Sequence, residues 1–283
     1  MKKKLALIMG LAAALCLCVG MLAGCGGNSS SSSSASDSGS ADAEAMTLVL
    51  GFDKGYPPYG YVGDDGEYTG VDIDLAKEAC DRLGWELKLE PIDWDAKDAL
   101  IDQGNITCIW NGFTYEGRED KYAFSDQYMI NAQVVVVKAD SDIKTLADLK
   151  DKTVITQVDS AALDVLDNDM KDLQDTFKGG KAQTISDYNN AFMQLESGTV
   201  DAVACDLSIA AYNMAGKPDV YKQLDEQLSS EHYAVGFKKG EEGQALADQI
   251  TATLKEMDAD GTVKTICDKY ADQGVSYANW CLK

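Results

Sequence analysis

Arginine and histidine are scarce in this chain of 283 residues. Its 25 basic residues include only two arginines, Arg82 and Arg118, and His232 is its one histidine. A single histidine excludes a multi-histidine metal site and leaves no basis for a histidine-based catalytic triad. The cysteines form no Cys-x-x-Cys pair and no zinc-binding pattern. We therefore predict neither a bound metal nor a cofactor.

Positive charge is low in the chain as a whole. Its 47 acidic residues give it a formal net charge of −22 at pH 7. Such an acidic surface argues against a nucleic-acid partner and against peripheral binding to anionic lipid. It does not argue against small-molecule binding, because a small ligand is bound by the residues of one cleft and not by the average charge of the whole surface.

One long hydrophobic run is present, at the N-terminus. Three lysines at positions 2–4 precede an apolar stretch over residues 5–23, and Leu22-Ala23-Gly24-Cys25 closes it. This order predicts a secretory signal peptide over residues 1–24. The tetrapeptide resembles the bacterial lipobox, which implies a lipid on Cys25. A plain transmembrane anchor is the alternative, and both interpretations place the rest of the chain outside the cytoplasm.

Residues 25–45 are poor in apolar side chains. After Cys25 they are mainly serine, glycine and alanine, which cannot bury a core, so we predict a flexible tether and a folded part from Met46 onward. Loss of the three lysines with the signal peptide would lower the formal charge from −22 to −25.

An odd number of cysteines remains in the folded part, so they cannot all pair within the chain. Two alternatives stay open: a disulfide between Cys267 and Cys281, or reduced cysteines packed in cores. The five residues are Cys80, Cys108, Cys205, Cys267 and Cys281.

Strand and helix patterns alternate along the folded part, which predicts an α/β fold with mostly parallel sheets. Four consecutive valines within 133–138 indicate a strand buried on both faces. Expected strands cover 47–52, 85–89, 106–110, 133–138, 153–156, 181–185, 200–204 and 233–237. Expected helices cover 71–83, 94–101, 146–149 and 207–214, and others begin near 160, at a Ser186 cap, near 244 and near 262.

Ligands of such sheets bind beyond the carboxyl ends of the strands, and polar residues stand there. Arg118 lies in a loop after a predicted strand, where an arginine can hold a carboxylate at two points; an ordinary surface arginine is the alternative. Asp206 can hold an ammonium or cap a helix. Ser160 and Ala161 open a helix and can offer backbone N–H groups to an anion, although Ser160 can also be a simple cap.

Three further residues, Asp53, Tyr56 and Trp94, lie at the ends of the first two strands. Aromatic rings there can enclose an organic ligand, although core packing is the usual reason for an aromatic residue. A zwitterionic amino acid needs partners for both of its charges when it is buried. Arg118 with a helix N-terminus suits its carboxylate, and Asp206 suits its ammonium.

Several segments, in order, resemble the bacterial polar amino acid-binding proteins of ABC transporters, solute-binding protein family 3. The resemblance covers nearly all of residues 46–283 and implies two α/β lobes joined by two hinge strands, in the type II periplasmic-binding-protein-like arrangement with the ligand between the lobes. It places the first lobe at 46–130 and 232–283 and the second lobe at 131–231. The matching segments are 51–59, 70–75, 111–118, 124–128, 149–160, 201–206 and 257–262.

The resemblance also implies a ligand-binding set. It assigns the ligand carboxylate to Arg118, helped by Thr114 and the amide of Ala161 beside Ser160, and the ammonium to Asp206 with the carbonyl of Gly112. Tyr56 and Trp94 would flank the ligand side chain. The residues expected to face its tip or the cleft are Asp53, Asn111, Gln157 and Cys205.

Two positions depart from the family pattern. The loop to Arg118 is one residue short, so Tyr115 and Glu116 lack a sure counterpart. Asp159 stands where glycine is more usual, and an acid beside a carboxylate site is unfavourable unless it points away.

The sequence thus predicts a monomeric, lipid-anchored binding protein on the outer face of the cell membrane. It would capture an L-amino acid, polar or neutral, such as glutamine or cystine, and deliver it to an ABC permease, without catalysis. The alternatives are a sensor module that presents the ligand to a receptor, and a secreted dehydratase or peptidoglycan lyase on the same fold.

Overall fold

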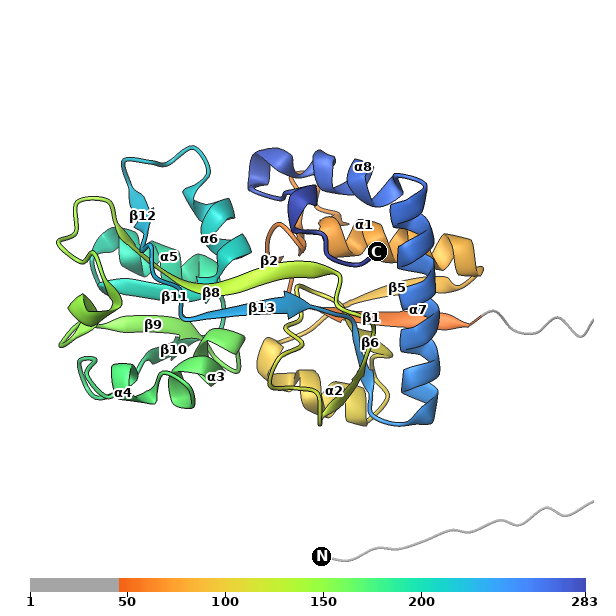
Figure 1. Ribbon diagram of the computed structural model, residues 1–283, viewed down its shortest axis with the longest axis horizontal. Coiled ribbons are helices and arrows are strands. Elements are labelled where there is room, and N and C mark those ends of the chain that lie inside the picture. Colours follow the sequence, from red (N-terminus) through yellow and green to blue (C-terminus); the bar gives the residue numbers. More distant parts are fainter. Residues whose placement is uncertain (1–45) are drawn as a thin grey trace, which may run out of the picture. The chain divides into compact units, whose positions relative to one another are not determined.

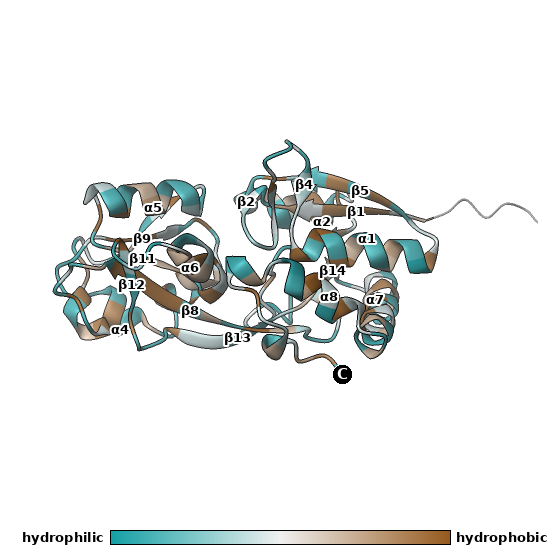
Figure 2. Ribbon diagram, turned by 90° about the horizontal axis from the view of Figure 1, so that it is seen from above, coloured by the Kyte–Doolittle hydropathy of each residue, from teal (hydrophilic) through white to brown (hydrophobic). Residues whose placement is uncertain are grey.

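The computed structural model describes residues 46–283, so the predicted signal peptide, Cys25 and tether lie outside the described residues. Two α/β lobes make up the described part, each built on its own sheet (Figure 1). Its apolar residues gather on the strands and on the inward sides of the helices (Figure 2). No helix among residues 46–283 is long and apolar enough to cross a membrane.

The first lobe contains a five-stranded sheet in the order β5-β1-β6-β14-β7. Strands β5, β1 and β6 are parallel, whereas β14 runs antiparallel to both β6 and β7. The strands are β1 (Thr47–Phe52), β5 (Glu86–Pro91), β6 (Cys108–Ile109), β7 (Tyr122–Phe124) and β14 (Gly236–Lys238). The helices are α1 (Val71–Leu83), η1 (Trp94–Ala96), α2 (Lys97–Asp102), α7 (Glu241–Ala259), α8 (Thr262–Lys269), η3 (Ala271–Gln273) and η4 (Tyr277–Asn279).

A small antiparallel sheet, β2-β3-β4, folds the Pro-rich loop that follows β1. Gly70 follows the last strand of this sheet and packs tightly against its backbone, since an added Cβ would lie 2.2 Å from the carbonyl oxygen of Tyr59. Glycine is therefore required at this position, just before α1 begins. The three strands are β2 (Gly55–Tyr56), β3 (Gly60–Val62) and β4 (Tyr68–Thr69).

The second lobe contains a sheet in the order β10-β9-β11-β8-β12, with β13 also paired to β8. Strands β10, β9 and β11 are parallel, and β8 is antiparallel to β11, β12 and β13. The strands are β8 (Met129–Lys138), β9 (Val154–Gln157), β10 (Gln183–Ile185), β11 (Ala202–Asp206), β12 (Tyr221–Gln223) and β13 (Ser229–Tyr233). The helices are η2 (Leu146–Leu149), α3 (Ala161–Asp167), α4 (Lys171–Gln174), α5 (Tyr188–Ser197) and α6 (Leu207–Met214).

Strands β8 and β13 connect the lobes as an antiparallel pair, with Met129 opposite Tyr233 and Gln133 opposite Ser229 (Figure 1). The valines at 134–137 of β8 are all buried, as their consecutive run predicts. The proposed lobe boundaries, after residues 130 and 231, fall within this pair and stay a prediction.

The prediction of mostly parallel sheets is wrong, because antiparallel pairs outnumber parallel ones. The reason is that β8 enters the second lobe's sheet, and β14 enters the first lobe's sheet, without the crossover helix that parallel neighbours need. The predicted strand over 233–237 is also wrong in its extent: β13 ends at Tyr233 and β14 begins at Gly236.

Helix boundaries agree well with the sequence patterns. Helix α1 covers Val71–Leu83 as predicted and ends on Gly84 in the left-handed conformation. The predicted Ser186 cap of α5 is wrong, because Asp187 is the residue whose side chain accepts from the Asn190 amide.

All five cysteines of the described residues are free, so the structure contains the reduced alternative and not the Cys267–Cys281 disulfide.

Candidate functional site

Nine of the twelve predicted ligand-binding residues line one small cavity. They come from β2, η1, the loop after β6, the end of β9, the start of α3 and the end of β11, which lie far apart in the sequence. The cavity has a volume of about 10 Å³, about the space of one water molecule. Its lining residues are Tyr56, Trp94, Gly112, Thr114, Arg118, Gln157, Ser160, Ala161 and Asp206.

The other three predicted residues do not line this cavity. Asp53 lies beside it, since its carboxylate accepts from Gln157 at 2.7 Å, and burial raises the pKa of this carboxyl. Asn111 accepts from the backbone amide of Asp53 at 3.0 Å and so fixes the backbone at Asp53. Cys205 is fully buried in the hydrophobic core.

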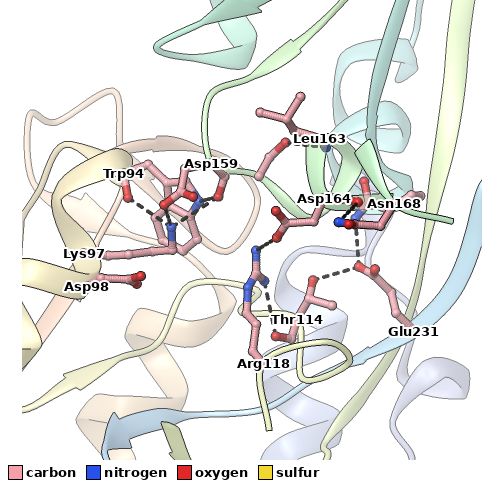
Figure 3. A network of polar contacts seen from close by, with 12 residues as sticks. Trp94, Lys97, Asp98, Thr114, Arg118, Asp159, Leu163, Asp164, Asn168 and Glu231 are labelled. Atoms are coloured by element: carbon pink, nitrogen blue, oxygen red, sulfur yellow. Dashed lines mark hydrogen bonds and ion pairs between the residues drawn. The ribbon is translucent and has the colours of Figure 1, made fainter. Parts of the chain in front are cut away.

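Arg118 is a buried arginine, with 6% of its surface exposed. Its guanidinium lies 4.9 Å from the centre of the Phe113 ring and donates to the carbonyl oxygen of Thr114 at 3.2 Å. A second nitrogen, Nη2, donates to a carboxylate oxygen of Asp164 on α3 at 3.3 Å (Figure 3). The alternative of an ordinary surface arginine is therefore wrong, and Asp164 shows that this guanidinium can hold a carboxylate.

Asp206 is buried and stands at the N-cap position of α6, yet its side chain makes no capping bond. One of its oxygens, Oδ1, accepts from Asn131 at 2.9 Å, from Gln133 at 2.7 Å and from Tyr233 at 3.2 Å. The alternative of a simple helix cap is thus wrong for Asp206. Burial raises the pKa of this carboxyl, which has only neutral donors as partners.

Ser160 differs from Asp206, because its hydroxyl does cap a helix. It accepts from the amide of Leu163 at 3.2 Å at the start of α3 and lies 3.2 Å from the Thr156 hydroxyl. Its neighbour Ala161 is the first residue of the helix, so its amide lies among the N–H groups that no helical carbonyl satisfies.

Glu231, on β13, is a buried acid that the sequence analysis missed. Its Oε1 accepts from Thr114, Asn131 and Gln133 at 2.7 to 2.8 Å. Burial, and next the neighbouring Asp206, raise its pKa to about 7. The only signal in the sequence was an acid at the predicted return to the first lobe, which alone says nothing about burial.

Asp159 departs from the family pattern and also takes an uncommon backbone conformation, with φ 57°. Its carboxylate bonds with Lys97 of α2, and its carbonyl oxygen accepts from Lys97 and from the Trp94 indole, both at 3.2 Å (Figure 3). The acid therefore points toward Lys97, as the sequence analysis required of an acid next to a carboxylate site. Lys97 is 2% exposed, and burial lowers the pKa of its ammonium group.

Gly112 is fixed by a buried acid at the start of α1. Asp72 accepts from the Gly112 amide at 2.6 Å and from the Tyr128 hydroxyl at 2.9 Å, and burial raises its pKa to about 7. Gly112 has φ 55°, and an added Cβ would lie 2.9 Å from the Tyr56 ring. Glycine is therefore required where the loop approaches the cavity.

The described part also contains larger cavities. One, of about 430 Å³, shares Trp94 with the small cavity and includes Asp53, Lys54 and Ser186. Another, of about 580 Å³, lies around Tyr122 and His232 and contains none of the twelve predicted residues. Within residues 46–283, no group of three or more histidine, cysteine, aspartate or glutamate side chains could hold a metal ion.

Residues 48–273 match the model of the family described as bacterial extracellular solute-binding proteins, family 3. The L-cystine-binding protein TcyJ of Escherichia coli (strain K12) is 30% identical over 228 residues, which cover 79% of this chain and 82% of that protein. The L-cystine-binding protein TcyA of Bacillus subtilis (strain 168) is 30% identical over 234 residues, covering 81% and 83%.

A solved structure of similar fold is that of an ABC uptake transporter substrate-binding protein from Streptococcus pneumoniae with bound histidine. It superposes with a TM-score of 0.77 at 31% sequence identity, and the match covers 82% of this chain and 94% of that one.

Proposed function

Because this chain belongs to the bacterial extracellular solute-binding proteins, family 3, we propose that it captures an L-amino acid and delivers it to an ABC permease. The observation that carries the proposal is the pairing of opposite charges in one cavity: Arg118 and Asp206 both line it, and both are buried. A bound zwitterion leaves water only if both of its charges find partners, and these two residues supply them.

The ligand carboxylate would take the place of Asp164 on the Arg118 guanidinium. A planar guanidinium binds a carboxylate through two parallel N–H bonds, which adds both energy and orientation. Thr114 and the free amide of Ala161 would complete this end. Asp206 and the carbonyl of Gly112 would hold the ammonium at the other end.

The ligand side chain would lie between Tyr56 and Trp94 and extend toward Asp53 and Gln157. The neighbouring cavity of about 430 Å³ supports a ligand longer than a small amino acid, since it continues from Trp94. Two curated relatives are named as L-cystine-binding proteins. We therefore place polar or neutral amino acids first, with cystine and glutamine as the leading candidates.

Binding requires the lobes to move. A cavity of about 10 Å³ is too small for any amino acid, so the ligand must enter when the lobes are apart. β8 and β13, which connect the lobes, would act as the hinge. A ligand that contacts both lobes favours the closed form by the contacts that it makes only there.

The anchoring of the protein rests on its sequence. We propose that cleavage before Cys25 and acylation of this residue leave a monomer tethered to the outer face of the cell membrane through residues 25–45. Tethering raises the local concentration of the closed form near its permease. The protein should incorporate labelled fatty acid, and replacement of Cys25 by serine should abolish this labelling.

The dehydratase or lyase alternative would use an acid in the cleft, and Glu116, the one glutamate of the loop 111–118, is engaged elsewhere. Glu116 accepts from the His232 amide at 2.8 Å and bonds to its ring at 2.7 Å, and it does not line the cavity. This arrangement favours binding over the dehydratase or lyase alternative. A sensor module would use the same site, and neighbouring permease or kinase genes would distinguish the two roles.

A thermal-shift screen of residues 46–283 against the common L-amino acids and L-cystine tests the proposal. A ligand of the folded state raises the melting temperature by mass action. We expect one or a few L-amino acids to stabilise the protein and their D-enantiomers to have no effect. No shift with any of them, after unfolding and refolding to remove bound ligand, would overturn the assignment.

A further inference from the structure

Two buried carboxylates, Asp206 and Glu231, share the same hydrogen-bond donors. The Asn131 side-chain nitrogen lies 2.9 Å from Asp206 Oδ1 and 2.7 Å from Glu231 Oε1. The Gln133 side-chain nitrogen lies 2.7 Å and 2.8 Å from the same two oxygens. Two amide groups thus bridge the acids, which come from β11 and β13 on either side of β8.

No cation of the described residues bonds to either acid. The remaining donors to the pair are the hydroxyls of Thr114 and Tyr233. Arg118, in the loop after β6, bonds instead with Asp164 and with the Thr114 carbonyl. The other titratable side chains that face the pair are Tyr56, Tyr59, Tyr188 and Cys205, and the bonded pair Glu116 and His232 lies next to Glu231 along β13.

Two negative charges so close together in a buried site repel each other, and the usual result is that one proton is shared between them. This agrees with the raised pKa of about 7 at Glu231 and with the raised pKa of Asp206. A second observation points the same way: among the described residues, Gln133 Oε1 is buried and has no donor. An acceptor beside two acids marks a place for an additional donor.

We propose that Glu231 is a positioning residue for the ligand ammonium, acting through Asp206: the two acids share one proton in the free protein, and the ammonium displaces it. The inference rests on the proposed binding of an amino acid at Asp206. The proton leaves the shared carboxyl for the buffer, and the positive charge of the ligand replaces it. Binding is therefore linked to proton release.

This linkage sets the direction of a pH effect. Below the pKa of the pair the ammonium must displace a proton, so its affinity falls as the pH falls. With the pKa of Glu231 raised to about 7, the dissociation constant should rise about tenfold between pH 7.5 and pH 6. Replacement of Glu231 by glutamine leaves Asp206 as a single acid: burial still raises the pKa of Asp206, but the repulsion between the two acids is gone.

Glutamine is a close structural replacement for Glu231. All three hydrogen bonds to Glu231 end on one oxygen, Oε1, and an amide oxygen can accept the same bonds. The Glu231→Gln variant should therefore fold, and it should differ from the original protein mainly in charge.

The test measures dissociation constants of L-glutamine and of L-cystine at pH 6 and pH 7.5, for the unchanged protein and for Glu231→Gln, with proton release measured by calorimetry in two buffers. We expect about a tenfold change in the unchanged protein and about half a proton released at pH 7, and a smaller change with less proton release in the variant. An equal pH dependence in both proteins would overturn the role of Glu231.

Absence of binding by either probe at pH 7.5 would count against the proposed ligand class and not against the pair. Unfolding of the ligand-free protein then tests whether Glu231 and Asp206 share a proton. A shared proton stabilises the folded state below the unfolded pKa of Glu231, and this stability is lost as the pH rises toward 7. The unfolding midpoint of Glu231→Gln relative to the unchanged protein should therefore be higher at pH 8 than at pH 5, and a constant difference would overturn the proposal.

Discussion

At the scale of single residues, the two arginines offer a matched comparison. Arg118 is buried and holds Asp164, whereas Arg82 is partly exposed and pairs with Glu78 and Asp260 on the surface of the first lobe. Replacing Arg118 by lysine keeps the charge but removes the planar two-point contact. We expect it to weaken amino acid binding by about 2 kcal/mol, roughly 30-fold, by the usual value of a hydrogen bond to a charged group.

Arg82→Lys is the control and should leave the dissociation constant unchanged, because its pairs are solvent-screened and remote from the cavity. Isothermal titration with the ligand found by the screen measures both variants. Equal affinities of the two variants would show that Arg118 does not bind the ligand carboxylate.

Asp72 predicts a pH dependence of stability. Burial raises its pKa to about 7 in the folded protein, from an ordinary value of 3.8, so the folded state holds a proton that the unfolded state releases between these values. Its contribution to stability is therefore complete below pH 3.8 and is lost as the pH rises through 7. Asp72→Asn removes this loss, and asparagine can still accept from Gly112.

Urea unfolding at pH 4 and pH 8 measures the effect. The unfolding free energy of Asp72→Asn relative to the unchanged protein should rise with pH by up to about 4 kcal/mol, from the size of the shift. Asp81→Asn, at an exposed position of the same helix, is the matched control for the loss of one acidic residue. A relative stability of Asp72→Asn that stays constant with pH would mean that this carboxyl is ionised at pH 4.

The sequence located the residues of the cavity that stand beyond strand ends, such as Arg118 and Asp206. It missed Glu231, Lys97 and Asp164, because they lie within a strand or helices, where a charged residue usually means a solvated face. Only the packing of separate elements brings them to the site. Strand geometry also explains the burial of Cys205: adjacent residues of a strand point to opposite faces, so Asp206 reaches the polar network and Cys205 the core.

At the scale of elements, helix α5 separates two candidate caps. The Asp187 side chain accepts from the Asn190 amide at 2.9 Å, whereas the Ser186 hydroxyl bonds only to Asp187 among the described residues. Asp187→Ala should cost about 1 kcal/mol of stability, the usual value of an N-cap, and Ser186→Ala close to none. Chemical denaturation measures both, and a larger loss for Ser186→Ala would restore the original prediction.

Helices were easier to predict than strands here. The apolar spacing of α1 and its glycine stop are local, so they determine both of its ends. Strand partners and directions depend on distant segments. β14 lies between β6 and β7 in the sheet, although it follows both of them by more than 100 residues in the sequence. No local pattern contains that information, which is why the antiparallel pairs were not foreseen.

At the scale of the whole described part, polar contacts hold the cavity nearly closed from both sides. Asp53 of the first lobe binds Gln157 of the second at 2.7 Å, and Lys97 binds Asp159. These two contacts between the lobes therefore also determine how readily the cavity opens. Amino acid affinity depends on this equilibrium, because only the closed form makes all of the ligand contacts.

Lys97 provides the test of this coupling. Replacing Lys97 by methionine keeps the apolar stem that packs in a site with 2% exposure but removes the ammonium that reaches Asp159. Asp159 is 43% exposed and can regain water, so the loss falls on the closed form and not on folding. We expect a loss of about 1 kcal/mol, the upper range for a partly solvated pair, and thus about fivefold weaker binding.

Small-angle scattering of the ligand-free protein should show a larger radius of gyration for Lys97→Met, and saturating ligand should reduce it to that of the unchanged protein. Lys88→Met is the matched control, since Lys88 is exposed and pairs with Glu90 of its own strand. It should change neither the radius nor the affinity. If Lys97→Met behaves like this control, the contact with Asp159 does not contribute to closure, and the closed form depends on the hinge strands and the ligand alone.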